Sequence, residues 1–300
     1  MKKITLLLLS LTFLNYSFSQ GILIEYKLKS GISYYTNGCK KPTNVIVLLA
    51  GFDGQAKEIF TESKIPYEGK KQGVLVIAIP TKFSFKLDSS TKYLIENCLS
   101  DQWNKNIYPK NQVTFGGYSA GGTLALEYLI ISKKEKNTFI IPKKVFTIDS
   151  PVDIIDIYNT LQREIIKNCS PPAYNEAKYA IPHIENQFGG SPKEKLNEYK
   201  YYSPYIRDST GGLNIVYLLN TPIRLHHDPD ILWQLDNRCR DLFDMNELCA
   251  SALINKLKME GNTNAELILN MRSGYRSNGE RHPHSWSIVD SKNLLSWIKN

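Results

Sequence analysis

The stretch from Gly116 to Gly122 reads GGYSAGG, and it decides the fold because it surrounds Ser119 with four glycines and an alanine, leaving Tyr118 as its only large neighbour in the stretch. Its centre matches G-x-S-x-G. A β-like run at residues 112–115 precedes it and a helical pattern follows from about residue 122, so the chain must turn from strand to helix within about two residues. Glycines remove the side-chain collisions that such a turn would cause. The pattern predicts a serine presented at the turn, with the N–H groups of the following helix aimed at it.

Two other interpretations of GGYSAGG compete with a nucleophilic serine. A phosphate-binding loop would need G-x-x-x-x-G-K-[ST] or G-x-G-x-x-G, and the stretch spells neither. The other alternative is a glycine-rich turn with an incidental serine. The strand before the motif, the helix after it and the doubled glycines favour the nucleophile.

Continuous apolar runs lie on both sides of this junction and predict buried strands. They fall at residues 45–49, 74–79, 113–115 and 145–148. Runs that are apolar on both faces are typical of parallel strands covered by helices on each side. Helical patterns at residues 90–103 and 123–133 lie between them. This alternation predicts an α/β fold with a doubly wound, mostly parallel sheet.

The remaining segments extend this core. Residues 22–28 and 32–36 are β-like and predict an N-terminal hairpin at the sheet edge. Residues 153–210 are rich in lysine and tyrosine and interrupt the rhythm of strands, so we expect a helical cap insertion there. The regular pattern then resumes, with expected strands at 222–227 and 265–271 and expected helices at 242–259 and 291–298.

Size and composition predict one globular domain. Of the 300 residues, 42% are hydrophobic and 22% are charged, which is typical of neither a disordered chain nor a membrane bundle. We expect residues 20–300 to form a single domain. The net charge is +8, but the densest lysine clusters are interrupted by glutamates, as on solvated helix faces. No basic stripe alternates with aromatic residues, so nucleic acid is not an expected partner.

Residues 1–19 have the character of a secretory signal peptide. They combine a positively charged start, an apolar run that ends at Leu14 and small residues up to Ser19. The apolar run is too short to span a bilayer, and no cysteine follows it directly, so we expect no stable membrane anchor. The interpretation is cleavage after Ser19, with Gln20 as the new N-terminus and export to the periplasm or the extracellular space.

The chain has five cysteines, at positions 39, 98, 169, 239 and 249. Export would allow them to oxidise, and an odd number leaves at least one unpaired within the chain. Their spacing does not resemble a zinc site. The pairs Cys39–Cys98 and Cys239–Cys249 are candidate bridges, and buried free thiols are the alternative.

The strand, turn and helix around GGYSAGG resemble the α/β-hydrolase fold superfamily, which includes serine esterases, lipases and peptidases. The likeness extends from about Val45 to the C-terminus. It implies that Ser119 is the nucleophile and that two backbone N–H groups form an oxyanion hole. Ala120 would supply one of them. Phe52, in the loop AGFDG, would supply the other, with Ala50 in place of the family's usual histidine. A plain glycine turn is the alternative interpretation of that loop.

The resemblance also implies a base in the loop after the last strand and an acid after an earlier strand. His284 is the expected base, because the sequence HSWS leads into the final helix, and His282 is the alternative. Asp230 is the expected acid, from matching HHDPD to the family pattern H-G-x-x-D, although the glycine is missing. Asp228 is the second candidate. Asp149 is a further one, since some relatives carry the acid at that position.

The same segment raises the question of a metal site. His226, His227 and Asp228 are consecutive, and the histidines near the C-terminus could approach them. Neighbouring residues of a strand point to opposite faces, so the two adjacent histidines cannot easily bind one ion. We therefore expect no metal, and no motif indicates a cofactor.

The sequence thus predicts a secreted serine hydrolase that cleaves a carboxylic ester. Tyrosines in the expected cap are compatible with a small-molecule or sugar-linked ester, or with ordinary packing. Arg272, Tyr275 and Arg276, near the expected base, could bind an anionic group or be solvated. Two alternatives remain: a serine peptidase related to the prolyl oligopeptidases, and a non-catalytic binding protein on a hydrolase fold. The sequence leaves the oligomeric state open.

Overall fold

The structure is a computed structural model that describes residues 22–52, 54–81, 84–208 and 213–300. The expected signal peptide therefore lies outside the described residues, as does Asp53 of the AGFDG loop. Within the described part of the chain, no helix has both the length and the apolar character needed to cross a bilayer.

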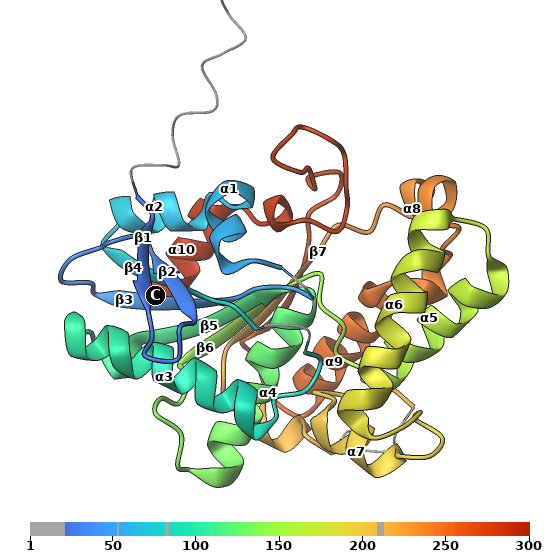
Figure 1. Ribbon diagram of the computed structural model, residues 1–300, viewed down its shortest axis with the longest axis horizontal. Coiled ribbons are helices and arrows are strands. Elements are labelled where there is room, and N and C mark those ends of the chain that lie inside the picture. The colour runs from blue at the N-terminus through green and yellow to red at the C-terminus, as the bar shows by residue number, and fades with distance from the viewer. Residues whose placement is uncertain (1–21, 53, 82–83, 209–212) are drawn as a thin grey trace, which may run out of the picture.

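One sheet of eight strands forms the centre of the molecule (Figure 1). In space the strands follow the order β1-β2-β4-β3-β5-β6-β7-β8. β1 and β2 form an antiparallel hairpin at one edge, β2 pairs antiparallel with β4, and all later pairs are parallel. The predicted α/β fold with a mostly parallel sheet is therefore confirmed. The strand bounds are β1 Ile24–Lys27, β2 Ser33–Thr36, β3 Asn44–Leu49, β4 Val74–Ile79, β5 Val113–Tyr118, β6 Lys144–Ile148, β7 Ile223–His227 and β8 Ala265–Leu269.

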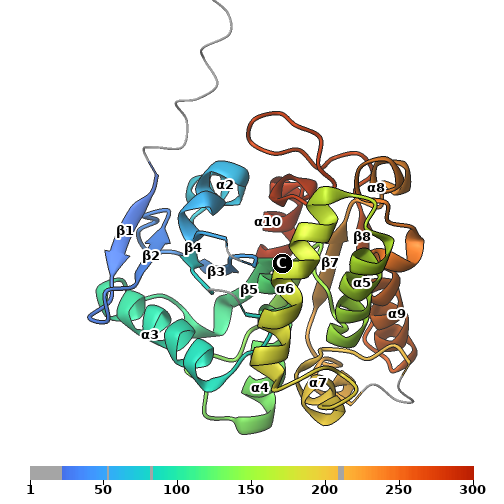
Figure 2. The ribbon, with the colours of Figure 1, turned by 45° about the vertical axis from the view of Figure 1, so that its right-hand side comes forward.

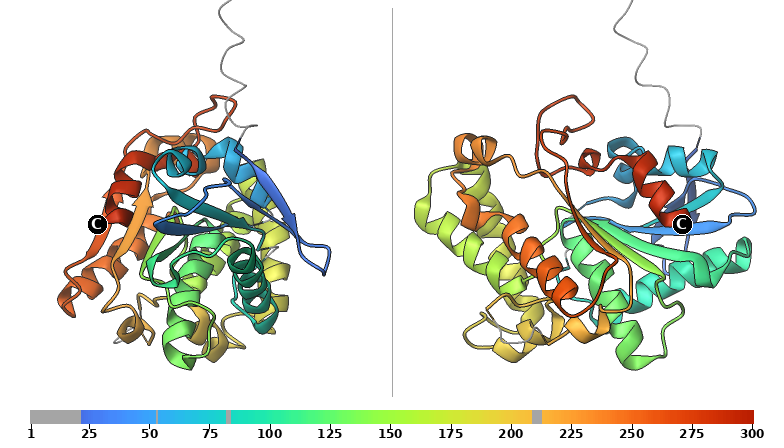
Figure 3. Two further views of the ribbon diagram at one scale, coloured as in Figure 1. Left: turned by 90° about the vertical axis from the view of Figure 1, so that its left-hand side faces the viewer. Right: turned by 180° about the vertical axis from the view of Figure 1, so that it is seen from behind.

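Helices cover both faces of the sheet, because alternate residues of each central strand bury apolar side chains on opposite sides. In β3, Val45 and Val47 belong to one core cluster, and Ile46 and Leu48 belong to the other. The first cluster is closed by α3 (Ser89–Lys105), α4 (Ala120–Glu135) and α9 (Asn246–Met259). The second is closed by α1 (Ile59–Glu62), α2 (Ile65–Lys71) and α10 (Ser291–Lys299). The sheet thus lies between two helical layers (Figures 1 and 3).

Residues 154–202 form three further helices, α5 (Ile154–Lys167), α6 (Pro171–Phe188) and α7 (Leu196–Tyr202). They surround a third apolar cluster, which also contains Phe85 and Ala120 from the main body. α5 and α6 pack side by side in front of the sheet in Figure 2, with α8 (Ile231–Arg238) beside them. These helices therefore stand at the end of the sheet where β5 leads into α4.

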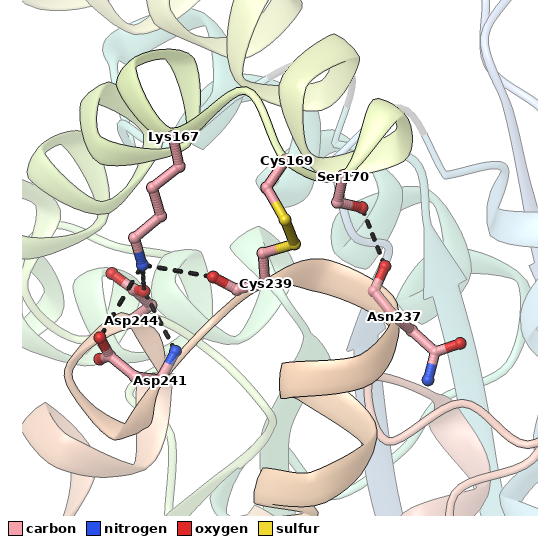
Figure 4. Close-up of a disulfide and its surroundings, with 7 residues drawn as sticks. All are labelled: Lys167, Cys169, Ser170, Asn237, Cys239, Asp241 and Asp244. Atoms are coloured by element: carbon pink, nitrogen blue, oxygen red, sulfur yellow. Dashed lines mark hydrogen bonds and ion pairs between the residues drawn. A yellow bond between two sulfur atoms is a disulfide. The ribbon is translucent and has the colours of Figure 1, made fainter.

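A disulfide joins Cys169, between α5 and α6, to Cys239, directly after α8 (Figure 4). The candidate pairs Cys39–Cys98 and Cys239–Cys249 are not formed. Cys39, Cys98 and Cys249 are buried free thiols, which was the alternative interpretation. Polar contacts accompany the bridge in Figure 4. The Ser170 hydroxyl donates to the carbonyl oxygen of Asn237 at 2.8 Å, and the Lys167 ammonium lies 2.6 Å from a carboxylate oxygen of Asp244.

Candidate active site

Ser119 occupies the turn between β5 and α4, with φ 54° and ψ −130°. This backbone conformation is rare for a residue with a side chain, and the neighbouring glycines make it possible. A Cβ on Gly117 would lie 2.3 Å from the carbonyl carbon of Gly121. A Cβ on Gly121 would lie 2.3 Å from the carbonyl oxygen of Ala50. The glycines of GGYSAGG therefore let strand, helix and the neighbouring loop meet around the serine.

The loop after β3 runs directly against this turn. A Cβ on Gly51 would lie 3.3 Å from Cβ of Ser119 and 2.9 Å from the ring of Tyr118. Ala120 is the first residue of α4, and Phe52 lines the same cavity as Ser119. The two residues expected to supply the oxyanion N–H groups thus flank the serine from two sides. Their part in catalysis stays a prediction.

His284 pairs with Asp149. Nδ1 of His284 lies 2.6 Å from Oδ2 of Asp149, the residue directly after β6. The ring of Tyr118 packs against His284 with 4.6 Å between ring centroids, and the Tyr118 hydroxyl donates to the His284 carbonyl oxygen at 2.9 Å. Asn246 holds the other oxygen of Asp149, since its side-chain amide donates to Oδ1 at 3.1 Å. Both partners of the pair are therefore fixed by further contacts.

The structure does not bring Asp230, the expected acid, to His284. One oxygen of Asp230 accepts a hydrogen bond from the backbone N–H of Trp233 and so caps α8, and the other lies 2.8 Å from the Arg281 guanidinium. Asp228 is not the partner either. It lies 2.9 Å from the same guanidinium, and it accepts hydrogen bonds from the backbone N–H groups of Arg272 and Gly274. Both carboxylates hold the loop that carries His284 in place. The sequence predicted Asp230 beside His284, and the structure has Asp149 there instead.

His227, the last residue of β7, contacts the other side of Asp149, and the sequence did not indicate this. Its Nδ1 lies 3.2 Å from Oδ1 of Asp149 and 3.9 Å from a carboxylate oxygen of Glu247. Burial opposes a charge on His227, but the two carboxylates together raise its pKa. The neighbouring His226 lies at 90° to the ring of Phe146, and burial lowers the pKa of His226 to about 3. The alternation of side chains along a strand is the only sequence signal that could have predicted that one of these two histidines reaches Asp149.

The charge of Asp149 follows from these contacts. Burial alone would raise the pKa of this carboxyl group, since only 6% of the residue is exposed. His284 and His227 outweigh that effect and hold the pKa of Asp149 well below its usual range. Glu247 differs, because burial and the negative charge of Asp149 raise its pKa to about 7. At neutral pH Asp149 is therefore the charged carboxylate that faces the histidines.

His282, the alternative base, lies farther from the carboxylate. Its ring packs on Trp233 with 4.9 Å between centroids, and its Nδ1 is 3.4 Å from the Arg276 guanidinium. Burial, with the positive charge of Arg276 and the proximity of His284, lowers the pKa of His282 to about 3. This histidine is uncharged at neutral pH and forms part of the wall beside His284.

A cavity of about 170 Å³ opens at this point. Ser119, Asp149 and His284 line it together with Phe52 and His282. The remaining wall comes mainly from α5, α6, α8 and the segment after α8, and it combines several charged side chains with apolar ones. Its members include Glu176, Gln234, Arg238, Arg240, Asp244, Asn246, Glu247 and Arg276, with Ile157, Leu161, Ala180 and Trp233 as apolar contacts.

Among the described residues, one group of side chains near the cavity has the donor atoms of a metal site. In Asp149, His227 and Glu247, one ligand atom from each lies within 4.8 Å of the others. An ion at this point would take its oxygen ligand from the carboxylate that holds His284. The group is therefore part of the surroundings of the histidine–carboxylate pair, and the expectation of no metal stays a prediction.

Comparison with known proteins gives a match in structure and none in sequence. No protein-family model matches the chain, and no curated protein matches its sequence. A solved structure of EstE5, soaked with p-nitrophenyl butyrate, is similar with a TM-score of 0.59 and 13% identity, over 92% of this chain and 85% of that one. An esterase of the bacterial hormone-sensitive lipase family is similar with a TM-score of 0.53 and 15% identity, over 93% of this chain and 83% of that one.

An acylaminoacyl peptidase from Pyrococcus horikoshii is also similar, with a TM-score of 0.54 and 13% identity over 92% of this chain and 41% of that one. At such identities the likeness concerns the arrangement of strands and helices. Three observations point to the same fold: the order and directions of the eight strands, the serine at the turn after β5, and the structural similarity to these proteins. The chain has the α/β-hydrolase fold.

Proposed function

We propose that this protein is a serine hydrolase that cleaves carboxylic esters through Ser119, His284 and Asp149. The observation that carries the proposal is the 2.6 Å contact between Nδ1 of His284 and Asp149, in a cavity that Ser119 also lines. A serine at a strand–turn–helix junction beside a histidine held by a carboxylate is the arrangement that activates a hydroxyl. Similarity to esterases supports an ester as the substrate.

In this mechanism Asp149 accepts the N–H of His284 Nδ1 and so leaves Nε2 free to accept a proton. Nε2 takes the proton of the Ser119 hydroxyl as its oxygen attacks the ester carbonyl. The same proton then passes to the leaving alcohol, and an acyl-enzyme remains on Ser119. Water attacks the acyl group in a second round, again with His284 as the base. Asp149 stabilises the charged imidazole in both rounds without accepting its proton.

The negative oxygen of each tetrahedral intermediate needs donors. We propose that the backbone N–H groups of Ala120 and Phe52 fill this role, since both residues flank Ser119. Such donors commonly contribute about 3 kcal/mol each to the transition state. Because the main chain donates, Ala50 in place of the family's usual histidine does not prevent this function.

Labelling with a fluorophosphonate probe tests the proposal. We expect an adduct on Ser119, located by mass spectrometry, which is absent in Ser119→Ala and His284→Ala. Asp149→Asn should lower kcat for a 4-nitrophenyl ester by about 10³–10⁴-fold, because the amide favours the wrong tautomer of His284. Asp230→Asn is the matched control and should keep labelling.

Three outcomes would contradict parts of this proposal. A folded wild-type protein without an adduct would favour a non-catalytic binding protein. Equal losses in Asp149→Asn and Asp230→Asn would remove the assignment of the acid. Efficient cleavage of peptide substrates but not of esters would favour the peptidase alternative, to which the similarity with the acylaminoacyl peptidase points.

We also propose that the protein is exported. The lysines and apolar run of residues 1–19 support it. The disulfide between Cys169 and Cys239 supports it independently, since such bonds persist in oxidising compartments.

A further inference from the structure

The cavity wall holds several charged side chains, and nearly all of the positive ones face a carboxylate. Arg238 pairs with Glu176, and Arg240 pairs with Glu164 and lies 3.7 Å from Glu176. These four groups balance one another. The carboxylates of α5 and α6 therefore already neutralise the two arginines, which do not need a charged ligand.

The acidic groups of the wall are compensated as well. Asp244 lies 2.7 Å from Arg163 and 2.6 Å from Lys167. Asp149 faces His284 and His227. Glu247, which also lines the cavity, lies 3.9 Å from Nδ1 of His227. Among the described residues, every carboxylate that lines the cavity therefore already has a partner other than a further arginine.

Arg276 is that further arginine. Its guanidinium contacts two neutral groups: Nη1 lies 3.5 Å from the hydroxyl of Tyr118, and Nη2 lies 3.4 Å from Nδ1 of His282. Both contacts are long for hydrogen bonds. Within the described residues, Arg276 has no carboxylate at ion-pair distance. A half-buried guanidinium with most of its five donors unused is suited to a carboxylate, which it can bind through two parallel hydrogen bonds.

The neighbours of Arg276 place it on one side of the reaction. Tyr118 packs on the ring of His284, and the centroid of His282 is 6.4 Å from that of His284. Arg276 therefore stands beside the base. The leaving alcohol must also lie beside the base, because His284 gives it a proton. A group bound by Arg276 belongs to the alcohol portion of the ester rather than to the acyl portion.

We propose that Arg276 binds a carboxylate on the alcohol portion of the substrate, so that the natural substrate is an O-acylated hydroxy acid. This inference rests on the proposed esterase function. Trp233, which packs against His282 at a tilt and lines the same cavity, supplies an apolar surface for the carbon skeleton of that alcohol. A cavity of about 170 Å³ suits a small acyl group and one small alcohol.

Two matched esters test it: 3-acetoxybenzoate, whose leaving group carries a carboxylate, and methyl 3-acetoxybenzoate, in which that charge is masked. We expect Arg276→Gln to lower kcat/KM for 3-acetoxybenzoate by about 10–100-fold, mainly through KM, as for the loss of a charge-assisted hydrogen bond. The methyl ester should change less than about threefold. Arg272→Gln removes the same charge from an exposed position on the same loop and should leave both values unchanged.

A second readout does not depend on turnover of the charged ester. 3-Hydroxybenzoate should inhibit hydrolysis of the methyl ester competitively in the wild type, and its inhibition constant should rise by a similar factor in Arg276→Gln. Arg276→Lys keeps the charge and should recover part of the loss, which guards against a variant that merely folds poorly.

The outcomes separate this inference from the proposed function. Equal changes for both esters in Arg276→Gln, or a wild type labelled at Ser119 that hydrolyses neither ester, would overturn the substrate class and leave the serine hydrolase in place. Absence of the fluorophosphonate adduct on wild-type protein would instead remove the proposed function, and this inference with it.

Discussion

Ser119 and Asp149 both have positive φ values, 54° and 44°, although neither is a glycine. Each is the first residue after a parallel strand, and each backbone N–H still donates to the next strand. Ser119 donates to Ile148 at 2.9 Å, and Asp149 donates to His226 at 2.8 Å. Such conformations cost about 1–3 kcal/mol and persist where the surroundings hold them. The sheet therefore sets the backbone of both residues at its carboxyl edge.

At the residue scale the sequence could predict the place of Ser119 at the turn and of His284 near it, but not which carboxylate contacts His284. The tight turn requires the glycines of GGYSAGG, so the motif by itself indicates that Ser119 is presented at that turn. The carboxylate beside His284 is set by contacts between segments far apart in sequence, since Asp149 meets His284 and His227 only after the sheet has formed. Asp230 was the expected acid and Asp228 the second candidate in the sequence, but Arg281 and the start of α8 engage them.

Glu247 gives a residue-scale prediction about stability. Burial and Asp149 raise its pKa to about 7, above the ordinary value of 4.5 for an unperturbed carboxyl group. Between these values the folded state binds more protons than the unfolded state, so the free energy of unfolding must fall as the pH rises. The slope is at most about 1.4 kcal/mol per pH unit.

Chemical denaturation at pH 5 and pH 8 measures this effect in wild type and Glu247→Gln. We expect the stability of the wild type relative to the variant to be greater at pH 5 than at pH 8, since glutamine cannot ionise. Glu280→Gln, at an exposed position, is the control and should show no such change. An equal difference at both pH values would mean that Glu247 titrates normally.

At the scale of the elements, the sequence could best predict the strands whose side chains are buried on both faces of the sheet. β4 matches the expected strand at both ends, because all six of its residues are buried. α8 was missed. Only Gln234 among its eight residues is buried, and the apolar residues Ile231, Leu232 and Leu235 are exposed, so its pattern does not follow a buried face. α4 begins at Ala120, before the residue 123 expected from the helical pattern. Glycines are poor helix formers, and close packing against β3 overrides that tendency here.

The disulfide between Cys169 and Cys239 gives a prediction at the same scale. It joins the α5–α6 connection to the end of α8 across a sequence separation of 70 residues. The loop-closure relation for a loop of that length predicts a loss of about 4 kcal/mol in the free energy of unfolding when the bond is removed. Thermal or chemical unfolding of Cys169→Ser with Cys239→Ser, compared with wild type, measures it.

Reducing agent provides the control for that comparison. It should lower the stability of the wild type to that of the double variant and leave the double variant unchanged. The KM of the wild type should rise on reduction as well, since Arg238 and Arg240 flank Cys239 and line the cavity. A wild type that is insensitive to reductant while its disulfide is demonstrably open would contradict the stabilising role.

At the scale of the whole molecule, the alternation of strands and helices predicted the type of sheet but not the order of its strands. β3 lies between β4 and β5, and that order depends on crossovers which no local pattern encodes. It brings the end of β3 beside the end of β5, with Leu49 paired to Gly117. The loop after β3 can then contact Ser119, so the topology itself assembles the site.

Export is a property of the whole chain and gives the last prediction. Expressed in full in a bacterial host, the protein should be recovered outside the cytoplasm without residues 1–19, beginning at Gln20. Three of its five cysteines should react with a thiol reagent after denaturation, because Cys169 and Cys239 are joined. The double substitution Leu8→Arg with Leu9→Arg would interrupt the apolar run of residues 1–19. That variant should therefore stay in the cytoplasm, uncleaved and with five reactive thiols. A wild type that keeps its first 19 residues would contradict the signal peptide, and five free thiols in exported protein would contradict the disulfide separately.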